Sequence, residues 1–527
     1  MHAVYAPLST EQSPVPGEPG NGDLHTVLGA EADSPGVTLS PMVPTPVRLF
    51  PKPRVTFALD DDDADVGMEG GGVGDVATVV GNGSSTRMSV LSNNALVPIT
   101  RPPTKPRDGI FALAFVVHFL IVGLLGLFEG NSVESAVFDY SNAGSWSSMI
   151  MIVILLGSFC GMVASGIVAV VESRETLLSV GILLSITLQA CLGNVLLILQ
   201  SSYSFLGILV LVSAMVDSLS YKKAKEGIAF TSALIQMVVD IFKSYGPSLS
   251  IAVGAIILAQ TFLLLWWGAF FVDLISTVSS VYAGYFVLLM AFSLYWIANF
   301  FHSLISYVVG GCVLWYFVKQ ESEPLAPGKR VLLHLHCAAT ASLGSICKGA
   351  LFCPLSQRIL AIHHWASRSK FAAPSLWNQI RNAVLSLVFP LVKHARRYHR
   401  LALPLTATYG RTLCKAADEQ MSSHPETVDL SVEDNTHFIL SATATELAGL
   451  ISITFGVVAE RREGASWPLF FFVCFCLAYC GLSLAFHTFN CAVDALILAF
   501  AARPQRFALE NQIAFLRFVR NTEPSLR

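Results

Sequence analysis

Charged residues are scarce in this chain, and that scarcity decides its class. Only 13% of the 527 residues are Asp, Glu, Lys or Arg, whereas 53% are hydrophobic. A soluble protein carries about 25% charged residues. A mean hydropathy of +0.60 over the whole length therefore indicates a polytopic membrane protein. The formal net charge of -3 provides no basic excess, which argues against nucleic-acid binding.

An early apolar run and paired cysteines are also missing. The first apolar run begins only at Ile110, so the sequence predicts no cleavable signal peptide. The 11 cysteines are scattered singly, apart from Cys474, Cys476 and Cys480, which predicts buried thiols rather than a disulfide framework. No histidine or carboxylate lies near that group in sequence, so we expect neither a metal site nor a cofactor.

The sequence divides into regions of different composition. Residues 1–105 are rich in Pro, Gly, Ser and Asp, with an acidic run at 60–63, and cannot bury enough surface to fold. We predict a disordered cytosolic N-terminal region there. Residues 106–505 hold the apolar segments and are predicted to form the membrane domain, with a cytosolic amphipathic segment at 360–430. Residues 506–527 are predicted to be a cytosolic tail.

The apolar segments predict an all-α bundle of about ten transmembrane helices. A bilayer core needs about 20 apolar residues per helix. The candidate spans are 110–128, 149–171, 176–199, 203–219, 248–272, 281–300, 302–318, 336–358, 435–458 and 467–499. The stretch 281–318 is too long for one ordinary span and carries Asn299 and His302 midway. It predicts either two helices or one long broken helix, so the count is ten or nine.

Lysine and arginine near the span ends predict the orientation. Ten spans place the basic segments 101–107, 222–225, 358–415 and 503–520 on one side, the cytosol, with both termini there. The loop 319–330 is also basic and would face outward.

Two further segments mix apolar and polar residues without forming an apolar run. These are 223–243 and 376–420, which we predict to be amphipathic. Such segments lie at the cytosolic interface or against the inner face of the bundle.

Small residues inside the spans predict close helix packing. Gly157, Gly161 and Ser165 are spaced four apart, as are Ser345 and Gly349 in "SLGSICKGALF". Because lipid tails provide no hydrophobic drive between helices, such small-residue faces are where another helix approaches closely.

Charged residues inside the spans are costly, by about 2.5–3.5 kcal/mol each at a helix centre. Lys348, Glu446 and Asp494 are the deepest of them. Each acid could pair with Lys348 or could line a pathway, and the sequence leaves both readings open.

Aromatic residues gather in 281–318. They are Tyr282, Tyr285, Tyr295, Trp296, Trp315 and Tyr316. One interpretation is an interfacial belt near span ends. The other is an aromatic cage for a quaternary ammonium, in which each ring contributes about 0.5–2 kcal/mol. Composition alone does not decide between the two.

Four motifs, in order, resemble one known family. "GGCVLWYF" followed by a proline-bearing loop and "SLGSICKGALF" is similar to a conserved pair of segments in the choline transporter-like proteins, solute carrier family 44. "EGIAFTSALIQMVVDIFKSYGPSL", "ATYGRTLCKAA" and "FNCAVDALILAF" resemble that family's amphipathic helix, cytosolic Tyr-Gly motif and late Ala-Val-Asp motif. The resemblance covers roughly 105–505. Lys348 departs from the family pattern, which has an uncharged residue there.

The resemblance implies a multi-pass transporter of choline or a related quaternary or primary amine, working by alternating access. It implies the plasma membrane, with an organelle membrane as the alternative. It favours the aromatic cage. The expected substrate-binding residues are Trp296, Tyr295, Asn299, Tyr285, Trp315, Tyr316 and Glu446. Hinges are expected at 299–302 and 310–311.

The expected partners are a choline-like cation and the lipid bilayer, and the sequence indicates no protein partner and no catalytic residue. Two other function classes stay open. One is a non-transporting membrane scaffold or regulatory protein. The weaker one is a membrane-embedded lipid enzyme, although neither an aspartate array nor a His-x-x-x-x-Asp pair occurs.

Overall fold

The computed structural model describes residues 106–130, 143–199, 204–277, 280–318, 326–368, 375–423, 435–463, 467–510 and 512. All of them belong to one compact unit, Val76–Arg527. The helices are α1 (Gly109–Gly130), α2 (Ala143–Val170), α3 (Arg174–Leu199), α4 (Ser204–Tyr245), α5 (Pro247–Thr277), α6 (Ser280–Val318), α7 (Pro327–Ala339), α8 (Leu343–Arg368), α9 (Ser375–Ala395), η2 (Arg396–Tyr398), α10 (Ala402–Tyr409), α11 (Leu413–Ser423), α13 (Asn435–Glu463), α14 (Trp467–Ala502) and α15 (Pro504–Glu510). The predicted N-terminal region 1–105 lies outside the described residues. Of the predicted tail 506–527 only 506–510 and 512 are described, and 506–510 belong to α15.

The helices are long and apolar, which confirms the prediction of an all-α polytopic membrane protein. Seven helical segments in the described ranges are long and apolar enough to cross a bilayer, and the bent pair α7–α8 would add an eighth. Two shorter apolar segments, Gly109–Leu125 and Gly207–Leu219, also occur. The predicted count of about ten is therefore approximate.

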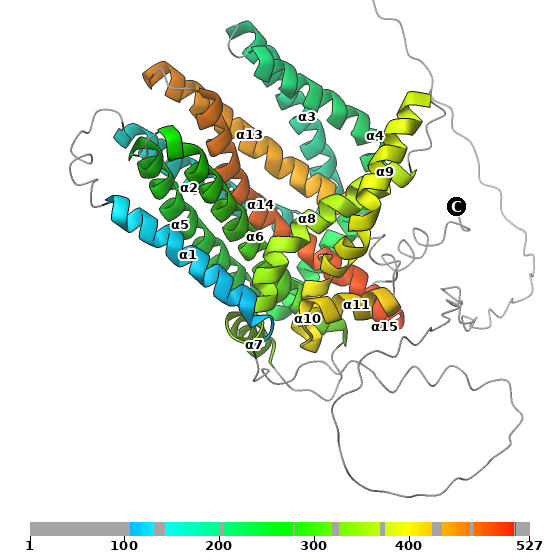
Figure 1. Ribbon diagram of the computed structural model, residues 1–527. Helices are drawn as coiled ribbons and strands as arrows, with labels where there is room; N and C mark the ends of the chain where they lie inside the picture. The colour runs from blue at the N-terminus through cyan, green and yellow to red at the C-terminus, as the bar shows by residue number, and fades with distance from the viewer. Residues whose placement is uncertain are drawn as a thin grey trace, which may run out of the picture. The chain divides into compact units, whose positions relative to one another are not determined.

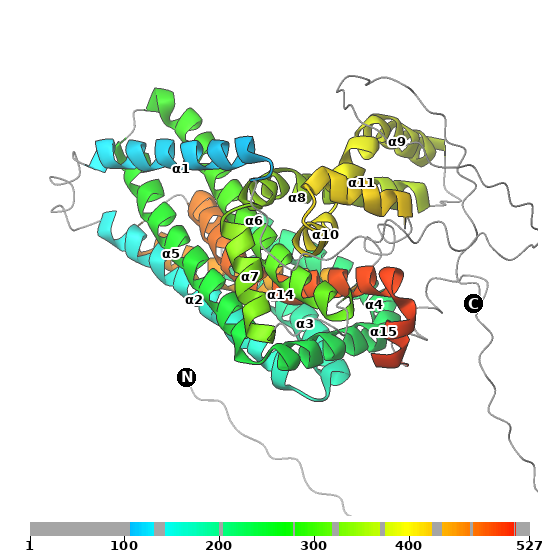
Figure 2. The ribbon, with the colours of Figure 1, turned by 90° about the horizontal axis from the view of Figure 1, so that it is seen from below.

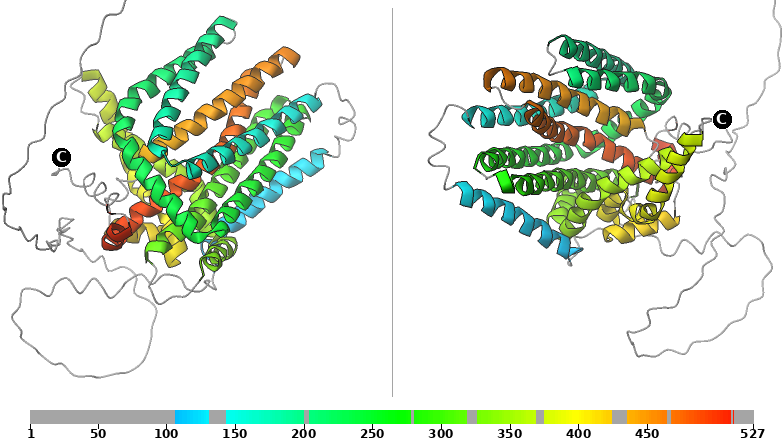
Figure 3. Two further views of the ribbon diagram at one scale, coloured as in Figure 1. Left: turned by 180° about the vertical axis from the view of Figure 1, so that it is seen from behind. Right: turned by 45° about the horizontal axis from the view of Figure 1, so that its top comes forward.

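Helix α14 forms the middle of the bundle. It packs against α13 on one side and against α2 and α6 on the other (Figure 1). Its residues 491–500 are all buried, as expected for a helix that is apolar on all faces. Helices α3 and α4 lie side by side, as the rear view also shows (Figure 3).

Glycines allow α2 and α14 to approach closely, as the small-residue spacing predicted. A Cβ added to Gly157 would lie 3.0 Å from the Cα of Ala478, and one added to Gly161 would lie 3.1 Å from the Cα of Leu482. On α14, Gly481 lies against the backbone of Ser158. Contact at this distance leaves no room for side chains, and it replaces the missing hydrophobic drive with close packing.

Helix α6 is continuous, so the expected division of 281–318 into two spans, or a break within it, is wrong. It runs for 39 residues. Asn299 donates to the carbonyl of Tyr295 at 2.8 Å, and His302 Nδ1 lies 2.8 Å from the carbonyl of Ala298. These polar side chains therefore find partners in the preceding turn of their own helix, and the backbone does not have to open to satisfy them.

Gly310 and Gly311 serve as the surface on which α10 packs. A Cβ on Gly310 would meet the ring of Pro404 at 2.6 Å, and one on Gly311 would meet Cβ of Ala407 at 2.6 Å. The glycines are thus explained by close approach of α10, within an unbroken helix.

The amphipathic segment 223–243 forms the second half of α4 and lies against the bundle, one of its two predicted places. Its apolar face, which includes Ile228, Leu234, Ile235 and Val238, is buried in the core. The predicted span 203–219 is the first half of the same helix.

The helices α7, α10, α11 and α15 gather at one end of the bundle (Figure 2). Helices α7 and α8 meet there at an angle of 76°. The start of α1 is attached at this bend, because the Arg107 N–H donates to the carbonyl of Ala341 at 2.8 Å. Gly344 makes room for the approach, since a Cβ there would collide with the carbonyls of Arg107 and Asp108.

Candidate functional site

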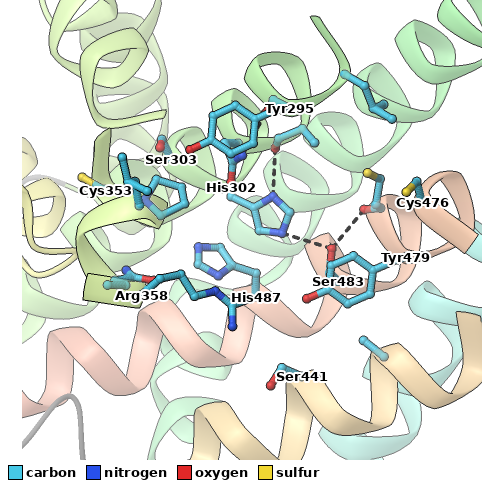
Figure 4. A pocket seen from close by; sticks show the side chains of 18 of the residues that line it. Tyr295, His302, Ser303, Cys353, Arg358, Ser441, Cys476, Tyr479, Ser483 and His487 are labelled. Carbon is cyan, nitrogen blue, oxygen red and sulfur yellow. Dashed lines mark hydrogen bonds between the residues drawn. The ribbon is translucent and has the colours of Figure 1, made fainter. Parts of the chain in front are cut away.

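A cavity of about 950 Å³ lies between α6, α8, α13 and α14, with part of α5 and the segment after η2 completing its wall. This volume is within the range of small-molecule sites, roughly 300–1,000 Å³. Its lining is mostly apolar and aromatic, with a few polar side chains that converge from α6 and α14 (Figure 4). Such a composition fits a small solute with an apolar body.

Helix α6 contributes one face. Tyr295, Asn299, His302 and Ser306 line the cavity at spacings of three and four residues, which places them on one side of a helix. The Tyr295 hydroxyl donates to the carbonyl of Leu351 on α8 at 3.1 Å, so its ring is held across the gap between the two helices.

Helix α14 contributes the opposite face with the same periodicity. Phe475, Tyr479, Ser483, His487 and Asn490 follow one another at intervals of three or four residues. The rings of Phe475 and Tyr479 are stacked, with centroids 6.1 Å apart. The face that α14 turns to the cavity is therefore aromatic at Phe475 and Tyr479 and polar from Ser483 to Asn490.

Two histidine–serine contacts join these faces. His302 Nε2 lies 3.2 Å from the Ser483 hydroxyl, and His487 Nε2 lies 2.7 Å from the Ser306 hydroxyl. The two imidazole centroids are 4.8 Å apart. Each contact joins a residue of α6 to one of α14, so together they connect the two helices beside the cavity.

The polar end contains an ion pair whose acid lies outside the cavity lining. Arg400 lies 3.0 Å from the carboxylate of Asp494, and His437 lies 3.6 Å from its other oxygen. The side chain of Asp494 is only 3% exposed, so its carboxylate is paired with Arg400 and His437 and does not face the cavity. His399, beside Arg400, is also buried, and this burial lowers its pKa to about 4.

Two of the seven predicted substrate-binding residues, Tyr295 and Asn299, line this cavity. Trp296 is buried on another face of α6, where its indole donates to the Cys347 carbonyl at 3.2 Å and its ring packs against Phe115. Tyr285 is 75% exposed at the start of α6 and does not line the cavity.

The other three predicted residues also lie elsewhere. Trp315 stacks under Arg330, whose guanidinium carbon is 3.5 Å from the ring centroid. Its neighbour Tyr316 packs edge-on against Phe317. Glu446 accepts from Gln189 at 2.8 Å, and the same amide donates to Asp217 at 3.0 Å. The structure therefore does not gather the seven residues into one cage.

Lys348 has an acid partner that the sequence did not suggest. Its ammonium lies 3.2 Å from Asp108 at the start of α1, and the Ser345 hydroxyl donates to the other carboxylate oxygen at 2.6 Å. Lys348 lies outside the cavity lining, so it connects α8 to α1 and does not face a solute there.

Sequence reasoning missed several cavity residues, chiefly His302, Arg358, Tyr479 and His487. The polar spacing along α14 was a usable signal, since Ser483, His487, Asn490 and Asp494 repeat every three to four residues within an apolar run. Among the described residues no group of three or more His, Cys, Asp or Glu is placed to hold a metal ion. All 11 cysteines are free.

The chain is similar in sequence to known proteins over much of its helical part. A model of the family described as plasma-membrane choline transporter matches residues 208–505, which is more than half of the chain. The protein PNS1 of Kluyveromyces lactis is 25% identical over 373 residues, covering 64% of this chain and 66% of that protein. A CTL-like protein of Dictyostelium discoideum is 22% identical over 254 residues, covering 47% of this chain and 44% of its own length. The chain thus spans just under two thirds of the first relative and less than half of the second.

Proposed function

We propose, from the premise that the chain belongs to the choline transporter-like family, that it carries choline or a related amine across a membrane. The observation that supports this most directly is the cavity between α6, α8, α13 and α14, which is of solute size and lies among helices long enough to span a bilayer. Plasma-membrane location and cytosolic termini are part of the proposal.

Aromatic rings would hold the organic cation. Tyr295, Phe475, Tyr479 and Trp267 all line the cavity. A trimethylammonium group carries a diffuse charge that ring faces attract by about 0.5–2 kcal/mol each when water is removed. Asn299 on the same face would accept or donate a hydrogen bond to a hydroxyl group of the solute.

Transport would proceed by alternating access. A site between packed helices inside the bundle has to open to each side in turn. In the continuous α6, the predicted hinge at 299–302 does not bend, so the movement would be one of whole helices against one another.

The test is radiolabelled choline flux in proteoliposomes, with and without a pH gradient. We expect saturable flux above that of protein-free liposomes. Tyr479→Leu keeps an apolar side chain but removes the ring, and we expect its choline affinity to fall about three- to thirtyfold. Phe262→Leu is the matched control, because Phe262 on α5 is 71% exposed and lies outside the cavity. Equal losses in both variants, or flux no greater than the protein-free background, would refute the proposal.

A further inference from the structure

The charged side chains that line the cavity are basic. In the described part of the chain no Asp or Glu is among the lining residues, whereas Arg358 and Arg400 are. The carboxylate of Asp494 is buried outside the cavity lining and neutralises Arg400. A solute that carries only positive charge would find attraction from the rings but no negative charge to balance its own.

Arg358 is the other arginine in the cavity lining, and it is not paired with Asp494. It extends from α8, one turn after Pro354, into the cavity towards His487 (Figure 4). It is exposed, and its charge acts on Tyr479 of α14. A guanidinium is always charged and offers a planar fork of donors that matches a carboxylate or phosphate. Because Arg358 is part of the cavity lining, its guanidinium is available to an acidic group on the solute.

Arg358 and Tyr479 enter the cavity from different helices, α8 and α14. In Figure 4 both side chains reach towards the middle of the view, where His487 lies. The volume also exceeds what choline requires, because seven non-hydrogen atoms at the roughly 30 Å³ that a water occupies fill only about 200 Å³ of the 950 Å³ present. The space allows a solute that reaches from the rings to the guanidinium.

We propose that the cavity binds a zwitterion, namely a choline derivative with an acid group such as a phosphate monoester. The trimethylammonium group lies against the rings of Tyr295 and Tyr479, and the acid group binds Arg358. A phosphate of this kind carries about 1.5–2 negative charges at pH 7, which offsets the positive lining. This inference rests on the proposed function, since it names the solute of the same site.

The experiment measures binding to the purified full chain, in detergent, for choline, phosphocholine and lysophosphatidylcholine below its micellar concentration. We expect phosphocholine to bind at least tenfold more tightly than choline. Arg358→Gln should weaken phosphocholine binding about ten- to hundredfold, the effect of losing a charged hydrogen-bond partner, without weakening choline. Arg358→Lys should restore much of the affinity. Arg396→Gln, an exposed arginine outside the cavity, is the matched control.

The outcomes separate the two proposals. If choline binds and is transported while phosphocholine neither binds nor competes, the zwitterion assignment is wrong and the proposed function stands. The assignment is also wrong if Arg358→Gln weakens both ligands equally. If lysophosphatidylcholine displaces labelled phosphocholine more strongly than free phosphocholine does, the natural ligand is a lipid with a phosphocholine headgroup. If it displaces the label less strongly, the natural ligand is a free solute. Absence of both binding and flux for every ligand overturns the proposed function and this inference with it.

Discussion

Replacing a glycine by alanine at two places on α2 should change stability in opposite directions. At Gly157 the new Cβ would lie 3.0 Å from both the Cα and the carbonyl oxygen of Ala478 on α14. At Gly166, on the same helix, nothing lies within 4 Å of it. The chemical change is the same, so the difference between the two variants reports the contact between α2 and α14.

The magnitude follows from two opposing terms. Alanine in place of glycine favours a helix by up to about 1 kcal/mol. Overpacking a close contact costs about 1–3 kcal/mol, and here the obstacle is backbone, which cannot rotate away as a side chain can. Gly157→Ala should therefore lower the free energy of unfolding by about 1–2 kcal/mol, whereas Gly166→Ala should leave it unchanged or raise it by up to about 1 kcal/mol.

The assay is unfolding of the purified protein in mixed micelles by increasing denaturant, followed by tryptophan fluorescence. The quantity compared is the difference between the two variants, which cancels effects common to any glycine replacement in α2. Similar shifts for Gly157→Ala and Gly166→Ala would show that α2 and α14 are not held by backbone contact and that the small-residue argument fails here.

Two further predictions concern the ion pair between α1 and α8 and the polar end of the cavity. The side chains of Asp108 and Lys348 are only 15% and 13% exposed, so Asp108→Asn should lower the free energy of unfolding by about 2 kcal/mol, and a double-mutant cycle with Lys348→Met should show about 1 kcal/mol of coupling. The control is Asp418→Asn, which breaks an exposed ion pair and should cost under about 0.5 kcal/mol. Equal costs for Asp108→Asn and Asp418→Asn would contradict the reasoning. Burial lowers the pKa of His399 to about 4, so between about pH 6.5 and 4 the unfolded chain binds a proton there that the folded chain does not. The free energy of unfolding should therefore fall by up to about 3 kcal/mol as pH falls through that window. His399→Gln should remove this pH dependence from the unfolding measurements, and an unchanged pH profile in the variant would contradict the prediction.

The architecture was predictable because the bilayer imposes it. Runs of about 20 apolar residues are a local pattern that survives into the structure at α2, α3 and α5, and the small residues four apart survive as a packing face at α2. The prediction for 281–318 was wrong, because the length of this stretch and its polar residues Asn299 and His302 predict two helices or a broken one. Polar side chains that bond to the preceding turn of their own helix give the same sequence pattern without any break.

The site was harder to predict, because clustering in sequence is not the same as sharing a face. Tyr295 and Trp296 are neighbours in sequence, but successive residues point about 100° apart around a helix. Only Tyr295 lines the cavity, and Trp296 packs against Phe115. The partners of Glu446 and Lys348, namely Gln189 and Asp108, lie far away in the chain, so no local pattern could reveal them.

The distribution of close packing limits how such a bundle could move if it works by alternating access. Helices α2 and α14 touch through their backbones at Gly157 and Gly481, and the start of α1 is bonded to α8 through Asp108. Close-packed contacts of this kind resist gradual deformation, so movement should occur where side chains and space separate the helices. That place is the cavity wall between α6 and α8, because there the faces meet across the gap through a polar contact, from the Tyr295 hydroxyl to the Leu351 carbonyl, which can exchange partners at small cost. The groups that would hold the solute are thus the same ones that would have to separate, so binding and opening would be coupled through a single surface.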